Sequence, residues 1–391
     1  MNIAILTSGV LPIPAVQGGA VENLIDFCLE YNNRHQLHDI TVYSVYDPEV
    51  KNHPAINSIV NHYRYIKTNG NIAKILKGIY LKIRGGREYY HYSVEYFFER
   101  VLWDMKRKKF DIIIVENRPG YVLKLSGKTT AKLVLHQGND FLNNQVPQYR
   151  KIYEAFDLII NASSYISERV TTINPNDFKC KTVLNGIDIN SFILAKPFSR
   201  QRFGLDEKNF VIVYSGRLIK EKGILELIQA IKQLNRSNIK LLIIGANAYG
   251  TNQKATKYIQ NLQEEALKIK ERVIFTGFID YKSVPSYLKM SDIAVVPSMW
   301  EEPFGLTVVE AMAAGLPLIT TRSGGIPEIC EGVATIVNRE NIVNNLANAI
   351  FDLYNYPEKR QAMAKASLER SKLFDKETYA KNFFAAIGEL R

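Results

Sequence analysis

The chain alternates short runs of β-branched and aliphatic residues with segments of helical periodicity, and it does so in two successive series. The predicted strands of the first series are residues 3–7, 40–44, 110–115, 133–135, 158–160 and 182–184. Those of the second are residues 211–214, 241–244, 273–275, 293–296, 318–320 and 335–337. Strands that alternate with helices form parallel sheets covered on both faces. We therefore predict an α/β fold with two doubly wound, Rossmann-like domains.

A polar, proline-containing stretch at residues 188–205 separates the two series and is interpreted as the linker. We predict an N-terminal domain over residues 1–193 and a C-terminal domain over residues 194–373. The last segment, residues 374–391, carries an apolar stripe at helical spacing that must pack on a neighbour, and we expect it to rejoin the first domain. Ligands of doubly wound sheets bind beyond the carboxyl ends of the strands, where we expect the site.

Composition excludes several classes of protein. With 391 residues and 46% hydrophobic content, the chain is long and apolar enough for two cores, which excludes disordered and collagen-like proteins. Its three cysteines are far apart and form no CxxC pair, so they are expected to be buried thiols of a reducing compartment. No basic start precedes the first apolar run, and no apolar run reaches about 18 residues. We expect a cytoplasmic protein.

Most of the net charge of +11 lies in residues 51–109, which hold thirteen basic and four acidic residues together with many aromatic side chains. Trp103 and the run Lys106, Arg107, Lys108 and Lys109 close this stretch. Basic and aromatic side chains together are typical of a membrane interface or a polyanion site. A solvated surface is the alternative. Nucleic acid is not expected as a partner, because no recognised binding motif accompanies the charge.

A pair of glycines, Gly18 and Gly19, follows the first predicted strand and precedes a segment of helical periodicity. Paired glycines let backbone N–H groups approach a phosphate, and a helix N-terminus carries about half a positive charge. A plain strand-to-helix turn has the same pattern. The sequence contains neither GxGxxG nor a Walker GxxxxGK[ST] motif, so both interpretations stay open.

A second glycine loop, residues 215–223, follows the first predicted strand of the second series. Within it, Arg217 offers a planar fork that matches phosphate oxygens, and Lys222 offers a point charge. Cations at the start of a helix oppose its dipole, which favours a binding role over a solvated loop. We predict that the two side chains neutralise a diphosphate without a metal.

Two carboxylates, Glu302 and Glu310, lie eight residues apart with Gly305 between them. If a helix begins near Gly305, Glu302 lies in the preceding loop and Glu310 lies about a turn and a half inside the helix. The two side chains then contact opposite ends of one hydroxyl-rich ligand, while the N–H groups at the helix start meet its phosphates. Two solvated glutamates are the alternative for an isolated pair.

Together these segments resemble the retaining glycosyltransferases of family 4, of the bacterial cell-surface polysaccharide type, which have the GT-B fold. The resemblance rests on Glu302 to Glu310 with Pro303-Phe304-Gly305 inside, on Gly216-Arg217-Leu218 with Lys222-Gly223, and on Gly18-Gly19. Residues 185–188 and 323–328 also fit, so it spans nearly the whole chain. It implies that two Rossmann-like domains face each other across a cleft, the first binding the acceptor and the second the nucleotide sugar.

The resemblance implies roles for individual residues. Glu310 would hold the ribose hydroxyls, and Glu302 would hold the donor sugar. Arg217 and Lys222 would bind the diphosphate. His136 would lie beside the donor sugar, although a histidine that ends a strand also serves ordinary structural hydrogen bonding. The other implied donor-site residues are Gly18, Gly19, Gly216, Phe278, Ile279, Phe304, Gly305 and Leu306.

The implied reaction moves a hexosyl unit from a nucleotide-diphosphate sugar, with UDP favoured, to a polyprenyl-diphosphate-linked glycan. Transfer on the front face would retain the configuration, with the leaving phosphate accepting the acceptor's proton. The sequence has no Asp-x-Asp, so we expect neither a metal nor another cofactor. Such an enzyme would be cytoplasmic and peripheral on the anionic inner membrane face. The alternatives are a transferase with a small soluble acceptor, a sugar-nucleotide epimerase and a non-enzymatic sugar-binding protein.

Overall fold

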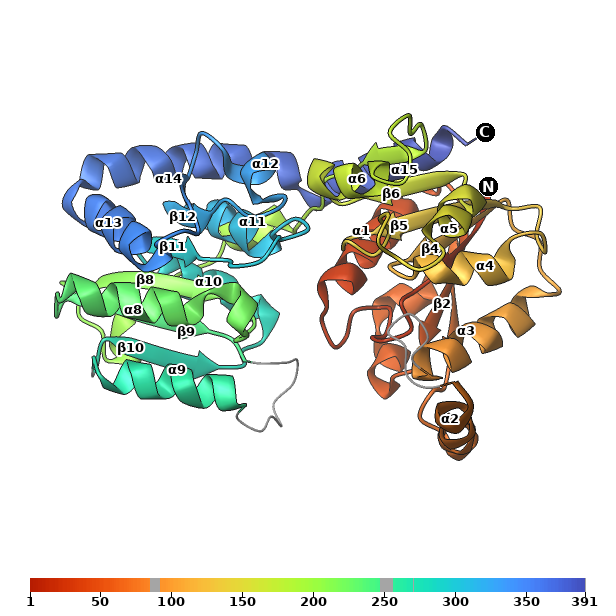
Figure 1. Ribbon diagram of the computed structural model, residues 1–391, viewed down its shortest axis with the longest axis horizontal. Helices are drawn as coiled ribbons and strands as arrows, with labels where there is room; N and C mark the ends of the chain where they lie inside the picture. Colours follow the sequence, from red (N-terminus) through yellow and green to blue (C-terminus); the bar gives the residue numbers. More distant parts are fainter. Residues whose placement is uncertain (85–91, 247–255, 270, 391) are drawn as a thin grey trace. The chain divides into compact units, whose positions relative to one another are not determined.

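The computed structural model describes residues 1–84, 92–246, 256–269 and 271–390, and the chain divides into two compact units (Figure 1). The first unit comprises Met1–Asn185 and Glu377–Arg391, and the second comprises Gly186–Lys376. Each unit is built on one parallel sheet with helices on both faces. The predicted α/β class with two doubly wound domains is therefore confirmed.

Within the described residues, the first unit forms a seven-stranded sheet in the order β3-β2-β1-β4-β5-β6-β7. Its strands are β1 (Asn2–Leu6), β2 (Asp39–Val45), β3 (Asn61–Ile66), β4 (Ile112–Glu116), β5 (Lys132–Gln137), β6 (Leu158–Asn161) and β7 (Cys180–Thr182). Its helices are α1 (Ala20–His35), α2 (Asn71–Arg84), α3 (Tyr92–Met105), α4 (Val122–Leu125), α5 (Tyr149–Ala155), α6 (Ser164–Thr171) and α15 (Lys376–Gly388). The strand order reverses between β1 and β4.

Burial on both faces explains the apolar strands of this sheet. In β1, Ile3 and Ile5 pack with α1 and α15 on one face, whereas Ala4 and Leu6 pack with α3, α4 and α5 on the other. The C-terminal helix α15 therefore completes the core of the first unit, as its apolar stripe predicted, and Tyr379 and Phe383 are almost wholly buried there.

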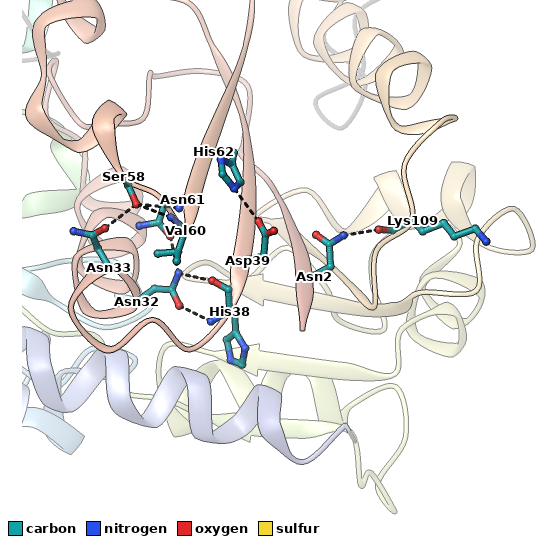
Figure 2. A network of polar contacts seen from close by, with 10 residues as sticks. All are labelled: Asn2, Asn32, Asn33, His38, Asp39, Ser58, Val60, Asn61, His62 and Lys109. Atoms are coloured by element: carbon teal, nitrogen blue, oxygen red, sulfur yellow. Dashed lines mark hydrogen bonds and ion pairs between the residues drawn. The ribbon is translucent and has the colours of Figure 1, made fainter.

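A polar network closes the edge of this sheet at which the strands begin (Figure 2). The buried Asn32, near the end of α1, donates to Asn61 Oδ1 at 2.7 Å and to the His38 carbonyl at 3.0 Å, and it accepts from the His38 backbone N–H at 3.0 Å. On the neighbouring strands, His62 pairs with Asp39 at 3.0 Å. These contacts join the end of α1 to the starts of β2 and β3. His38 and His62, two of the six histidines, therefore have structural partners at the edge of the sheet opposite the carboxyl ends of the strands.

Within the described residues, the second unit forms a six-stranded sheet in the order β10-β9-β8-β11-β12-β13. Its strands are β8 (Phe210–Ser215), β9 (Ile239–Ile244), β10 (Val273–Gly277), β11 (Ile293–Val296), β12 (Leu318–Thr321) and β13 (Thr335–Val337). Its helices are α7 (Ile189–Ile193), α8 (Ile224–Leu234), α9 (Lys257–Leu267), α10 (Val284–Lys289), α11 (Leu306–Ala313), α12 (Ile326–Cys330), α13 (Ile342–Asn355) and α14 (Pro357–Ser371). Helices α8, α9 and α13 cover one face, and the strand order reverses between β8 and β11.

Three segments differ from the prediction. β3 was missed, because half of the residues of this edge strand are polar and they interrupt any apolar run. The strand predicted at residues 182–184 lies two residues earlier, in β7. The stretch 188–205 was interpreted as a linker. It contains α7 and belongs to the second unit, which begins at Gly186.

No helix among the described residues has both the length and the apolar character needed to cross a membrane.

Candidate functional site

The switch point of the second sheet brings together the two loops that the sequence singled out. β8 and β11 are neighbours, so the loop after β8 and the loop after β11 leave the sheet side by side at its carboxyl edge. The Met299 N–H donates to the Glu221 carbonyl at 2.8 Å, which fixes one loop against the other. This is the position at which doubly wound sheets bind ligands.

Lys222 and Glu302 form an ion pair within this edge. Lys222 Nζ lies 2.5 Å from Glu302 Oε1, and the Ser298 hydroxyl donates to the same oxygen at 2.5 Å. The two charged side chains are only 16% and 7% exposed. A buried carboxylate needs such partners, because an uncompensated charge away from water is costly. Lys222 therefore holds the carboxylate in place and brings a positive charge to the same point.

Two glycines, one after β8 and one after β12, allow the backbone at this edge to pack closely. A Cβ on Gly223, whose φ is +69°, would lie 2.0 Å from the Pro297 carbonyl oxygen, and one on Gly324, whose φ is +50°, would lie 2.2 Å from the Glu302 carbonyl oxygen. That carbonyl accepts from the Gly325 N–H at 2.8 Å. A side chain at Gly324 would therefore displace the backbone of Glu302, and one at Gly223 would displace the backbone of Pro297 in the same loop.

Helix α11 begins where the sequence predicted. Gly305 is its N-cap with a φ of +115°, and Leu306 opens the helix. The first N–H groups of a helix lack intrahelical partners and attract anions. Phe304, before the cap, is buried edge-on against Phe374 at a centroid distance of 5.9 Å. The Phe304 ring therefore anchors the loop, and its backbone leads into the helix start.

Glu310 lies inside α11, as predicted, and is 6% exposed. The Tyr281 hydroxyl, from the short 3₁₀ helix η7 (Tyr281–Ser283), donates to Glu310 Oε1 at 2.9 Å. Burial raises the pKa of Glu310 from 4.5 to about 7, although the Tyr281 hydrogen bond opposes this rise. A buried carboxyl group with a raised pKa, beside the switch point of a sheet, is typical of a ligand-binding group.

The remaining predicted donor-site residues lie at the same edge. Gly216 and Arg217 follow β8, and among the described residues the exposed Arg217 guanidinium has no ion pair or hydrogen bond. Phe278 and Ile279 follow β10, and the Phe278 ring is 42% exposed. Arg217 is thus available for an anion, whereas Lys222 already contacts a carboxylate.

In the first unit, Gly18 and Gly19 follow β1 and lead into α1, with Gly19 as the N-cap. Glu22, in the first turn of α1, lies against Gly19, and a Cβ on Gly19 would meet Glu22 Oε2 at 2.2 Å. Burial raises the pKa of Glu22 to about 7, with the Glu116 charge acting in the same direction. The helix start predicted to receive a phosphate therefore has a buried carboxyl of its own chain beside it.

His136 ends β5 in a closed environment. Its Nδ1 lies 2.8 Å from Glu116 Oε2, its Nε2 lies 3.4 Å from the Tyr379 hydroxyl, and its ring packs edge-on against Phe383 at 5.0 Å. His136 is 3% exposed and Glu116 is 1% exposed. These contacts join β4, β5 and α15, which is the structural role left open by the sequence. No group of three or more His, Cys, Asp and Glu side chains within the described ranges is arranged to hold a metal ion.

The basic stretch is spread over several elements of the first unit. Trp103 is 61% exposed, with Arg100 stacked over it at 5.1 Å, and Lys106, Arg107 and Lys109 are exposed. Lys108 was expected at the same surface, but it pairs with Asp104 at 2.8 Å and also contacts the Tyr43 hydroxyl. The side chains of Lys77, Lys82, Arg84 and Arg87, and of Tyr80, Tyr89, Tyr90 and Tyr92, lie outside the described residues.

Three residues of these sites were not anticipated. Ser298 and Tyr281 contact the predicted carboxylates, and Glu116 contacts His136. Ser298 follows β11 and Glu116 ends β4, so their places at the carboxyl ends of strands were a usable signal. Tyr281 had no such signal, because its contact depends on how η7 packs on α11.

Comparison with known proteins shows what the second unit is similar to. Residues 195–370 match the family described as "Glycosyl transferases group 1". Spore coat protein SA of Bacillus subtilis is 27% identical over 388 residues, which cover 94% of this chain and 93% of that protein. The lipopolysaccharide 1,2-N-acetylglucosaminetransferase of Salmonella typhimurium is 30% identical over 248 residues, covering 60% of this chain and 61% of that enzyme.

The whole fold matches solved structures as well. Alr3699/HepE from Anabaena, crystallised in complex with UDP and glucose, aligns with a TM-score of 0.74 and 21% identity over 99% of both chains. At this identity the likeness concerns the fold, and it covers both units. Residues 195–370 are therefore similar to the glycosyl transferases group 1, and the whole chain has the two-domain GT-B fold.

Proposed function

We propose that this protein is a retaining glycosyltransferase of family 4 that moves a hexosyl unit from a nucleotide-diphosphate sugar to a lipid-linked glycan. The observation that carries the proposal is the grouping of Lys222, Glu302 and the start of α11 at one sheet edge, with Arg217 and Glu310 also at that edge. Positive charge, helix N–H groups and hydroxyl-binding carboxylates together suit a sugar diphosphate. A simple sugar-binding site needs no such charge.

The leaving diphosphate is the group that this site stabilises. Negative charge develops on it as the bond to the sugar breaks, and prearranged positive groups are often the largest catalytic contribution. Among the described residues, Arg217 supplies an unpaired guanidinium, and α11 supplies its N-terminal N–H groups. Lys222 adds a second positive charge at this edge, and its ammonium group is ion-paired with Glu302. These groups perform without a metal the neutralisation that a divalent cation performs elsewhere, which is why we propose a metal-independent reaction.

The carboxylates hold hydroxyl groups in this proposal. Glu310 accepts from the ribose, and Glu302 accepts from the donor sugar while Lys222 and Ser298 fix its other contacts. Both are therefore committed to binding, unlike the nucleophile of a retaining glycosidase. Retention then follows from front-face attack, in which the acceptor oxygen takes the place of the leaving phosphate and that phosphate takes the acceptor's proton.

UDP is the proposed nucleotide. The support is the fold shared with Alr3699/HepE, which was crystallised with UDP and with UDP-glucose. A lipid-linked acceptor for cell-surface polysaccharide is proposed because one relative is a lipopolysaccharide N-acetylglucosaminetransferase. We assign the acceptor to the first unit, since the donor groups lie in the second.

An anionic membrane surface is the proposed location of this reaction, on the cytoplasmic face. The first unit exposes an apolar stripe on α2, in which Ile72, Ile75, Leu76 and Ile79 are 71%, 65%, 41% and 51% exposed. Their spacing places them on one side of the helix. Exposed apolar side chains on a basic, amphipathic helix suit the interface of a bilayer. Trp103 and the three exposed basic residues after α3 add aromatic and cationic groups to the same unit.

Transfer is tested with purified full-length protein, a panel of UDP-hexoses and GDP-hexoses, and a polyprenyl-diphosphate-linked glycan. Release of nucleoside diphosphate that depends on the acceptor, with an α-linked product from an α-linked donor, supports the proposal. An inverted product would contradict retention. Conversion of the donor without an acceptor would favour the epimerase, and binding of free sugar without any turnover would favour a binding protein.

Membrane binding is tested by flotation with phosphatidylglycerol-containing and neutral vesicles. We expect partitioning onto anionic vesicles to fall when Ile72, Ile75 and Ile79 are changed to Gln. It should also fall when Lys106, Arg107 and Lys109 are changed to Gln, and in that variant by roughly 1 kcal/mol per basic residue. The control removes three exposed lysines of the second unit, Lys208, Lys257 and Lys365. Equal partitioning of all three variants would mean that the apolar stripe of α2 and the basic residues after α3 are ordinary solvent-exposed surfaces without a role in membrane binding.

A further inference from the structure

Within the described part of the chain, the single hydrogen bond to the Glu310 carboxylate comes from outside its own helix. Among the described residues, Glu310 Oε1 accepts from the Tyr281 hydroxyl at 2.9 Å, and no hydrogen bond reaches Oε2. The residues on either side of Glu310 in α11, Val309 and Ala311, are apolar and buried. One oxygen of the carboxylate is therefore held and the other is left for a ligand.

Tyr281 is built to hold that oxygen while remaining open to a ligand. The residue is 42% exposed, and its ring packs edge-on against the buried Phe192 of α7 at 6.2 Å. Burial of the hydroxyl, together with the charges of Glu310 and Asp188, raises the pKa of Tyr281 well above its ordinary value. The hydroxyl is thus a permanent donor, and Tyr281 follows the exposed Phe278 by three residues in the loop after β10.

We propose that Tyr281 is a nucleoside-positioning residue, which orients Glu310 so that its free oxygen meets the ribose hydroxyls and which borders the nucleoside with its exposed ring. This rests on the proposed function, since it assumes that a nucleotide sugar binds at α11. The chemical class of the ligand is a ribonucleoside diphosphate. The free carboxylate oxygen accepts from the vicinal diol of ribose, and the start of α11 and the exposed Arg217 suit the diphosphate.

Loss of the Tyr281 hydroxyl has two consequences. The carboxylate loses the bond that fixes its rotamer, so the ribose contact weakens. The Glu310 pKa also rises, because that hydrogen bond is what lowers it. Among the described residues, the other charged group that acts on Tyr281 is Asp188, and Lys376 pairs with Asp188 at 2.9 Å. That ion pair is unchanged by the substitution, so a shifted pH profile reports Glu310.

The experiment is calorimetric titration of full-length Tyr281→Phe with UDP and 2′-deoxy-UDP, and with GDP and 2′-deoxy-GDP in parallel, between pH 6 and pH 8.5. We expect the affinity for the ribonucleotide to fall about tenfold. Its preference over the deoxynucleotide is expected to shrink to about twofold, and the pH midpoint of binding to move upward. Adding Tyr281→Phe to Glu310→Gln should change affinity less than about twofold, because both act on one contact.

The control is Tyr287→Phe, which removes a hydroxyl from α10, the helix that follows η7. Among the described residues, the Tyr287 hydroxyl makes no hydrogen bond, and its ring packs on Phe198 and Phe203. If wild type and control bind the ribonucleotide and Tyr281→Phe binds it equally well with the same deoxy discrimination, the inference is wrong while the proposed function stands. If the wild type binds no nucleotide, the proposed function fails and the inference fails with it.

Discussion

Replacing Glu310 with Gln should stabilise the second unit at alkaline pH while removing nucleotide binding. The Glu310 carboxyl has a pKa of about 7 in the folded chain and 4.5 as its ordinary value. Above pH 4.5 the unfolded chain loses this proton, whereas the folded chain keeps it until about pH 7. The free energy of unfolding therefore falls as the pH rises through this window. The glutamine side chain of the variant does not titrate, so the variant escapes that loss.

The size of the effect follows from the difference of about 2.5 between the folded and the ordinary pKa of Glu310, because a difference of one in pKa corresponds to about 1.36 kcal/mol. We expect the variant to exceed the wild type in unfolding free energy by under about 1 kcal/mol at pH 5 and by about 3 kcal/mol at pH 8. A residue that costs stability in this way is retained for binding, so the same variant should bind UDP poorly.

The chain has two tryptophans, Trp103 in the first unit and Trp300 in the second, next to the Glu302 loop. A Trp103→Phe background therefore lets the fluorescence of Trp300 report guanidinium unfolding of the second unit alone. The control is Glu340→Gln, which removes an exposed carboxylate of the same unit. A Glu310→Gln difference that is the same at pH 5 and pH 8, or a loss of stability at pH 8, would refute the reasoning.

Three further predictions follow from the same edge of the sheet. Among the described residues, Lys222→Met leaves the buried Glu302 carboxylate with only the Ser298 hydroxyl, so the free energy of unfolding should fall by about 3 kcal/mol in the Trp300 assay. Arg217→Ala should change stability by under about 0.5 kcal/mol, because Arg217 is exposed, and should still weaken UDP binding; a larger stability loss than that of Lys222→Met would contradict the structure. EDTA should leave the transfer rate unchanged, and complete loss restored by Mg²⁺ would exclude the metal-independent reaction.

The buried strands were predictable because both faces of each sheet are covered. Strands such as β11 are continuous apolar runs, and their carboxyl ends mark where a site lies before any contact is known. The edge strand β3 has no such run, and its alternating Tyr63 and Tyr65 were the available signal. Helix α7 was hidden in a polar stretch because its stability comes from packing, as the buried Phe192 shows.

The site was predictable as far as local sequence determines it. The start of α11 at Gly305 and the place of Glu310 inside it followed from spacing. The partners of the carboxylates did not, because Tyr281 and Lys222 reach α11 and its loop through tertiary packing. The pairing of Lys108 with Asp104 was available from the sequence, because the two residues lie four positions apart, yet the prediction treated Lys108 as one of four equivalent cations.

The central claim is that the second unit binds a nucleotide-diphosphate sugar through Glu310. Calorimetric titration of the full-length protein with UDP, GDP and dTDP, each followed by its hexose conjugates, tests it most directly when Glu310→Ala is titrated alongside. The account predicts binding of one nucleotide and its sugars, with UDP favoured, and loss of that binding in the variant. Binding of none of them, or equal binding by wild type and variant, would contradict it.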